Sequence, residues 1–67
     1  MKEKLYRFNY TVINFRTMKR ESGNIEVTHF TVGEATNKAS DILEFRYPSK
    51  KGYLVEINEE YVELEVK

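Results

Sequence analysis

Apolar and polar residues alternate along residues 5–16, which is the repeat of a β-strand with one buried face. The apolar members of this alternation are Tyr6, Phe8, Tyr10 and Val12, and the polar residues between them are Arg7, Asn9 and Thr11. After Val12 the apolar positions change phase to Ile13 and Phe15. This change predicts a β-bulge, or a strand end that leaves the sheet.

A second strand is predicted over residues 25–32, after a turn over residues 17–24. The turn contains Ser22, Gly23 and Asn24, which are residue types that favour turns. The second strand alternates again, with one face formed by Ile25, Val27 and His29. Two strands joined by a short loop predict a β-hairpin.

One helical pattern follows, from Glu34 or Thr36 to Arg46. Its apolar face is formed by residues three or four positions apart, namely Ala35, Ala39, Ile42 and Leu43. Thr36 is a candidate N-cap, and Thr31 with Glu34 is an alternative capping box. Because Pro48 cannot continue a helix, we expect the helix to end near Arg46.

The last part of the chain predicts a second hairpin. Residues 53–57 alternate as a third strand, residues 58–59 form a tight turn, and residues 60–66 form a fourth strand. In this last strand the residues expected to face the core are Val62, Leu64 and Val66. The predicted fold is α+β: a two-layer ββαββ unit, with a four-stranded antiparallel sheet of order 2-1-3-4 and one helix packed on one face. The other face of the sheet stays uncovered.

Composition and length fit one small domain over residues 1–67. The chain is 40% hydrophobic and 33% charged, which is ordinary for a soluble globular protein. It has no cysteine, which excludes disulfides, zinc–thiolate sites and cysteine nucleophiles. No apolar stretch has the form of a signal peptide or a membrane-spanning helix, so we expect a cytoplasmic protein with no membrane partner.

The net charge is zero, but the charges are unevenly distributed. Residues 1–20 hold six bases, namely Lys2, Lys4, Arg7, Arg16, Lys19 and Arg20, against the single acid Glu3. Residues 53–66 hold five acids and no base, namely Glu56, Glu59, Glu60, Glu63 and Glu65. Either the two segments neutralise each other across neighbouring strands, or the surface is polarised.

The uncovered sheet face is the first candidate site. The residues expected on it are Arg7, Asn9, Thr11, Tyr61, Glu63 and Glu65. Its glutamates would repel phosphate, so the sequence favours a small non-enzymatic interaction module that binds a protein partner through this face. An exposed edge strand is an alternative binding surface, and the strand over residues 25–32, with Glu26 as its one charged residue, is the better candidate for pairing or a homodimer.

Two alternatives stay open. The first is nucleic-acid binding through the basic hairpin tip, by Arg16, Lys19 and Arg20 together with Lys50 and Lys51. The second is a structural subunit of a homo-oligomer.

No residue pattern indicates an enzyme. His29 is the single histidine. The residues near it in the sequence provide neither further ligands at the spacing of a metal site nor a nucleophile for general-base catalysis. The glutamates alternate with apolar residues, as on the solvent face of a strand. We therefore expect no catalytic residues, no metal and no cofactor.

The order of elements resembles many small accessory proteins of bacterial phages and mobile elements. The resemblance lies in the aromatic hairpin, the short alanine-containing helix that begins at Val32-Gly33-Glu34-Ala35-Thr36, and the ending Phe45 to Pro48. It implies a cytoplasmic, non-enzymatic binding protein and assigns no site residue.

Overall fold

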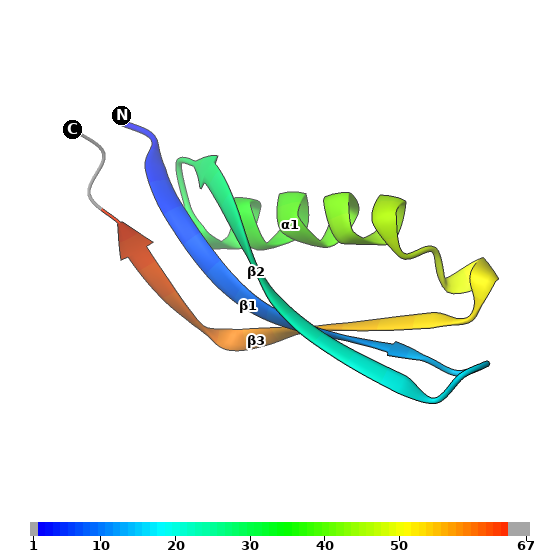
Figure 1. Cartoon of the computed structure of the whole chain (residues 1–67). Helices are drawn as coiled ribbons and strands as arrows, with labels where there is room; N and C mark the ends of the chain where they lie inside the picture. The colour runs from blue at the N-terminus through cyan, green and yellow to red at the C-terminus, as the bar shows by residue number, and fades with distance from the viewer. Residues whose placement is uncertain (1, 65–67) are drawn as a thin grey trace.

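The computed structural model describes residues 2–64 and contains one helix packed on a three-stranded antiparallel sheet (Figure 1). The elements in chain order are β1 (Lys4–Asn14), β2 (Lys19–His29), α1 (Val32–Arg46), the 3₁₀ turn η1 (Ser49–Lys51) and β3 (Tyr53–Leu64). The strand order is β2-β1-β3, so β1 is central and the other two strands are edges. The α+β class, the single helix and the predicted neighbours of the first strand are confirmed.

The predicted four-stranded ββαββ sheet is wrong, because the third and fourth predicted strands are one strand. Residues 58–59 form no hairpin turn, and β3 continues along β1 as far as Leu64. A two-residue hairpin turn needs positive φ angles, and among the described non-glycine residues only Met18 has one. By continuing, β3 also gives the first half of β1 a second hydrogen-bonded neighbour.

A bulge with two extra residues stands where a turn was expected to end the third strand. Between the pairs Phe8–Tyr61 and Tyr10–Ile57, the single β1 residue Asn9 lies opposite residues 58–60. The Glu60 N–H donates to Asn58 Oδ1 over 3.0 Å, which stabilises the extra loop. β3 changes direction there, in its orange part (Figure 1).

The first hairpin is longer and more regular than predicted. β1 pairs with β2 in one register from Lys4–His29 to Asn14–Lys19, so the bulge predicted after Val12 does not exist. Ile13 stays in the alternation and lies on the uncovered face beside Leu54. The turn is confined to residues 15–18, where the side-chain oxygen of Asn14 accepts from the Arg16 N–H over 2.9 Å.

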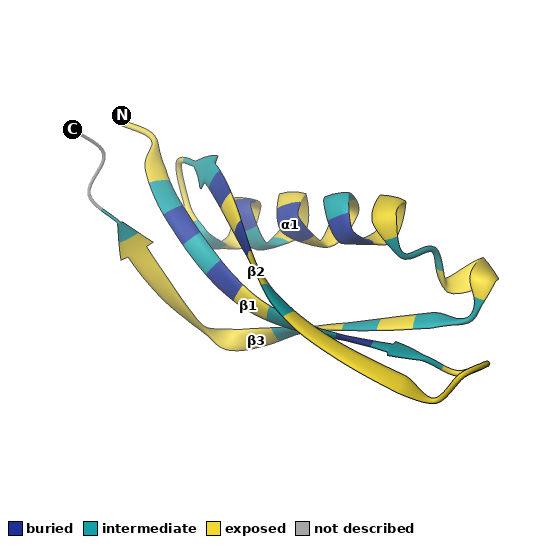
Figure 2. Ribbon diagram, in the orientation of Figure 1, coloured by how far each residue is buried: buried dark blue, intermediate teal, exposed yellow. Residues whose placement is uncertain are grey.

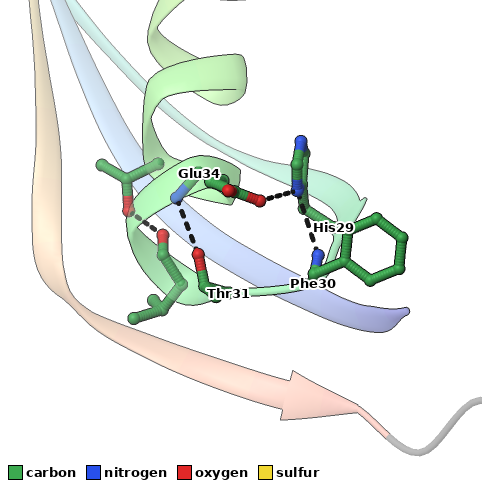
Figure 3. A network of polar contacts seen from close by, with 6 residues as sticks. His29, Phe30, Thr31 and Glu34 are labelled. Atoms are coloured by element: carbon green, nitrogen blue, oxygen red, sulfur yellow. Dashed lines mark hydrogen bonds and ion pairs between the residues drawn. The ribbon is translucent and has the colours of Figure 1, made fainter. Parts of the chain in front are cut away.

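The helix begins earlier than the first predicted positions and ends as predicted. Thr31 is the N-cap, and its Oγ1 accepts from the Glu34 N–H over 3.3 Å (Figure 3). The Glu34 carboxylate does not complete a capping box, because its Oε2 lies 2.6 Å from His29 Nδ1. The last helical residue is Arg46.

The core lies between α1 and one half of the sheet. Seven residues form it, from β1, β2 and one face of α1: Tyr6, Phe8, Ile25, Val27, Ala35, Ala39 and Leu43. The two alanines are fully buried, and their small side chains let the helix lie close to β2. Figure 2 shows most of the buried residues in the half of the sheet that α1 covers, and Val12 is a further buried residue of β1 nearer the hairpin tip.

No helix in residues 2–64 is long and apolar enough to cross a membrane.

Candidate functional site

The predicted sheet-face site is divided between two faces. Arg7, Asn9 and Thr11 lie on the uncovered face, as expected, because Tyr6 and Phe8 point toward the helix. Residues directly opposite in an antiparallel pair share a face, and the pairs Phe8–Tyr61 and Tyr6–Glu63 therefore place Tyr61 and Glu63 on the helix side. Glu65 lies outside the described residues.

Tyr61 acts instead as a partial cover for the core. Its ring lies 5.7 Å from that of Tyr6 and 6.1 Å from that of Phe8, centre to centre. Val62 and Leu64, which were expected in the core, lie on the uncovered face opposite Arg7 and Leu5. The predicted alternation was right, but its phase was wrong, because β3 continues past Ile57 through a bulge with two extra residues and does not reverse at a two-residue turn.

The uncovered face is polar in its middle and apolar at its ends. A shallow hollow of about 690 Å³ is lined by hydroxyl, amide and carboxylate side chains, namely Asn9, Thr11, Ser22, Asn24, Glu56 and Asn58, together with Tyr10, Gly23 and Ile57. Arg7 beside it pairs with Glu26 over 3.0 Å. The exposed apolar side chains toward the ends are Val62, Leu54 and Phe15.

The structure brings together the two basic segments that the sequence places far apart. The Phe15 N–H donates to the Gly52 carbonyl over 2.9 Å, which joins the hairpin tip to the segment that follows η1. Arg16 runs along Gly52, where a Cβ atom would lie 3.5 Å from Arg16 Cγ. We call the resulting surface the basic end, and it consists of Arg16, Lys19, Arg20, Lys50 and Lys51. All five are exposed; Lys19, opposite Asn14, lies on the helix side of the sheet, and Arg20, opposite Ile13, lies on the uncovered face.

The charges of the basic end are not neutralised locally. Within residues 2–64 the ion pairs are Lys4–Glu63 and Arg7–Glu26, and the contact between His29 and Glu34 is of similar length; none of the three involves the basic end. Of the nearby acids, Glu44 accepts from the Ser49 N–H and hydroxyl, and Glu21 lies on β2. The Lys4–Glu63 pair joins one base of the first segment to one acid of the last segment, at the opposite end of the sheet.

A small cleft opens on the helix side of the same end. We call it the tyrosine cleft; its volume is about 190 Å³, and it is lined by Val12, Asn14, Thr17, Lys19, Glu21, Tyr47 and Tyr53. The rings of Tyr47 and Tyr53 meet edge to face with their centres 5.5 Å apart. The neighbouring Tyr10 and then desolvation raise the pKa of Tyr47 above its ordinary value of 10.0.

Sequence reasoning did not select Tyr47 or Tyr53 as site residues. A signal was present, since the two tyrosines flank the Lys50-Lys51 pair in the sequence. Their meeting, however, depends on η1 reversing the chain after Pro48. Gly52 completes this reversal with a φ of 92°, a conformation that other residues rarely adopt.

His29 makes its polar contacts with neighbouring residues at the start of α1. The Phe30 N–H donates to His29 Nδ1 over 3.0 Å, while Glu34 Oε2 lies 2.6 Å from the same atom (Figure 3). One nitrogen cannot accept and donate at once, so the two contacts are not hydrogen bonds of Nδ1 at the same time. No group of three or more His, Asp or Glu side chains in residues 2–64 could hold a metal ion.

Comparison with protein-family models, with curated proteins and with solved structures gives no match. Function is therefore inferred from the geometry of the chain itself.

Proposed function

We propose that this protein is a small non-enzymatic module that binds nucleic acid through the basic end. The observation that supports this is the Phe15–Gly52 hydrogen bond, which joins the hairpin tip that carries Arg16, Lys19 and Arg20 to the segment that carries Lys50 and Lys51. The uncovered sheet face, which was expected to bind a protein, does not contain Tyr61 and Glu63, because both lie on the helix side of the sheet. The residues expected to bind nucleic acid instead lie on segments that meet at one end of the sheet.

Phosphate recognition needs exposed cations that are not already paired. Lysine and arginine side chains neutralise backbone phosphates and release condensed counterions, which makes such binding strongly dependent on salt. Five phosphate contacts correspond to a slope of log affinity against log salt of about −3.5 for a single strand. Although the net charge is zero, the acids Glu59, Glu60 and Glu63 lie on the far half of β3, so they do not oppose an approach to the basic end.

The test is fluorescence anisotropy with a labelled oligonucleotide of about 12 nucleotides, over a series of salt concentrations. The double variant Lys50→Ala/Lys51→Ala removes two charges from the basic end. The matched control is Lys2→Ala/Lys38→Ala, which removes two exposed lysines elsewhere. We expect the first variant to lower the magnitude of the salt slope by about 1.4 and the control to leave it unchanged.

Arg16→Ala/Lys19→Ala/Arg20→Ala extends the same test to the hairpin tip. We expect its salt slope to fall in magnitude by about 2. No binding by the wild-type chain, or equal losses in the control and in both variants, would refute nucleic-acid binding at this end.

A second candidate is association with another protein through the uncovered sheet face. The exposed Leu54 and Val62, at 41% and 52% of their full accessible surface, favour it. Because Arg7 and Glu26 already pair within this face, a second copy of the chain can approach without charge repulsion. Light scattering over a concentration series tests this, with Val62→Lys expected to abolish a dimer and Phe45→Lys on the exposed side of α1 expected to leave it intact.

A further inference from the structure

The tyrosine cleft and the basic end are parts of one surface. Lys19 belongs to both, and Thr17 in the cleft wall follows Arg16 directly. An extended polyanion that contacts both Arg16 and Lys19 therefore passes the cleft. The lining of the cleft is partly apolar and aromatic, and a phosphate group gains no favourable contact with such side chains.

Resting on the proposed function, we infer that the tyrosine cleft holds one unpaired base while the basic end holds the neighbouring phosphates. The partner is then a single-stranded nucleic acid. Base stacking on aromatic side chains beside a positively charged surface is how proteins bind single strands with little sequence preference. A duplex keeps its bases stacked inside the double helix, so none of them can enter the cleft.

The geometry of the two rings limits the cleft to one base. Tyr47 and Tyr53 stand at 67° to each other, so a planar base that stacks on one ring meets the edge of the other. The volume of about 190 Å³ suits one planar ring system and excludes a folded peptide segment. Asn14, Thr17 and Glu21 stand in the wall and can accept or donate hydrogen bonds at the edge of the base.

Charge complementarity selects this occupant over an apolar peptide or a neutral ring. Lys19 of the basic end lines the cleft, and none of the five basic side chains has an ion-pair partner within residues 2–64, so they attract an anionic chain. Glu21 is the acid in the wall, and it would disfavour a carboxylate inside the cleft itself. A ligand with an anionic backbone and uncharged planar side groups fits both parts.

The decisive experiment compares three oligonucleotides of equal length, about 12 residues, by anisotropy: oligothymidylate, an abasic strand with the same phosphates, and a duplex. We expect the abasic strand to bind about tenfold more weakly than oligothymidylate, because stacking contributes roughly 1–3 kcal/mol per base. Equal affinity for the normal and abasic strands would overturn the base-binding inference and leave the phosphate proposal intact. Absence of binding by all three would overturn the proposed function itself.

Variants then locate the base. Tyr53→Leu and Tyr47→Leu should each remove most of the preference for the normal strand over the abasic one, while Tyr53→Phe, which keeps the ring, should retain it. Phe30→Leu is the control, since Phe30 is an exposed aromatic residue at the end of the sheet opposite the hairpin tip. If both leucine variants keep the full preference, the base does not lie in the cleft.

Three further measurements keep the test decisive. Circular dichroism establishes that each variant is folded; should a leucine variant unfold, NMR titration of the wild-type chain replaces it. We expect the ring signals of Tyr47 and Tyr53 to shift with oligothymidylate and not with the abasic strand. Binding of polyglutamate as tight as that of oligothymidylate would identify an acidic protein segment, not a nucleic acid, as the partner.

Discussion

The ring of Tyr10 lies over Gly23 on the neighbouring strand, so that a Cβ atom on Gly23 would come within 2.7 Å of Tyr10 Oη and 2.8 Å of Cζ. The sequence suggested that Gly23 forms a turn. In the structure Gly23 lies inside β2, paired with Tyr10, and the absence of a side chain makes room for the tyrosine. The same ring also reaches Tyr47, with 6.5 Å between the two centres.

Gly23→Ala should destabilise the fold because it displaces Tyr10. The expected loss is about 1 kcal/mol in urea denaturation, as the ring must leave a packed position. In a Tyr10→Ala background the clash is absent, and there the same change should be neutral or stabilising by roughly 0.5 kcal/mol, since alanine suits a strand better than glycine. Equal effects in the two backgrounds would contradict the ring-over-glycine contact.

Leu43→Ala should leave the chain largely unfolded. Leu43 is fully buried at the centre of the helix contact, and its truncation costs about 2–5 kcal/mol. A domain of this size has roughly 3–5 kcal/mol of total stability. Far-ultraviolet circular dichroism measures the loss, and Phe45→Ala, at a position 88% exposed, should stay as stable as the wild type.

The length of the bulge in β3 can be tested by deletion. Removing Glu59 and Glu60 together leaves the alternation of β3 unchanged, so Tyr61 should keep its contacts with Tyr6 and Phe8 and the fold should persist. Removing Glu59 alone leaves Asn58 and Glu60 opposite Asn9, so Tyr61 faces the core only if β3 keeps a bulge that interrupts its pairing with β1. We expect the single deletion to lower the urea midpoint more than the double deletion, and the opposite order would show that the phase of β3 is not fixed by β1.

Stability should fall at high pH because of Tyr47. Tyr10, and then desolvation, raise the pKa of Tyr47 in the folded chain above its ordinary value of 10.0, so the folded state retains a proton that the unfolded state has lost. The stabilisation is complete below pH 10 and disappears as the pH rises through the folded pKa. Thermal melting between neutral pH and the alkaline range measures this loss, and Tyr47→Phe should reduce its slope.

The first part of the fold follows from local chemistry. The strict alternation from Tyr6 to Val12 allows only one burial pattern for a strand, and the structure keeps it. The helix ends where Pro48 requires, and its buried residues Ala35, Ala39 and Leu43 are those that the helical spacing selects. These features depend on residues within a few positions of one another, which is why the pattern alone predicts them.

The errors arose where distant segments decide the outcome. Residues 58–60 are polar and turn-like, but β1 offers its unpaired edge to Tyr61 and Val62, and pairing along it is more favourable than a hairpin without positive φ angles. The two extra residues of the bulge then fix which face Tyr61 takes. Alternation tells which residues share a face and cannot tell which face that is.

The sequence by itself thus determined the central strand, the helix and its buried face, and the absence of cysteine chemistry, because each of these depends on residue type and short spacing. Only the tertiary structure decided the number of strands, the side on which Tyr61 lies, and the meeting of Arg16 with Gly52 and of Tyr47 with Tyr53. Those relationships depend on strand register and on how η1 returns the chain to the sheet. Both are set by contacts between segments far apart in the sequence, so no local pattern contains them.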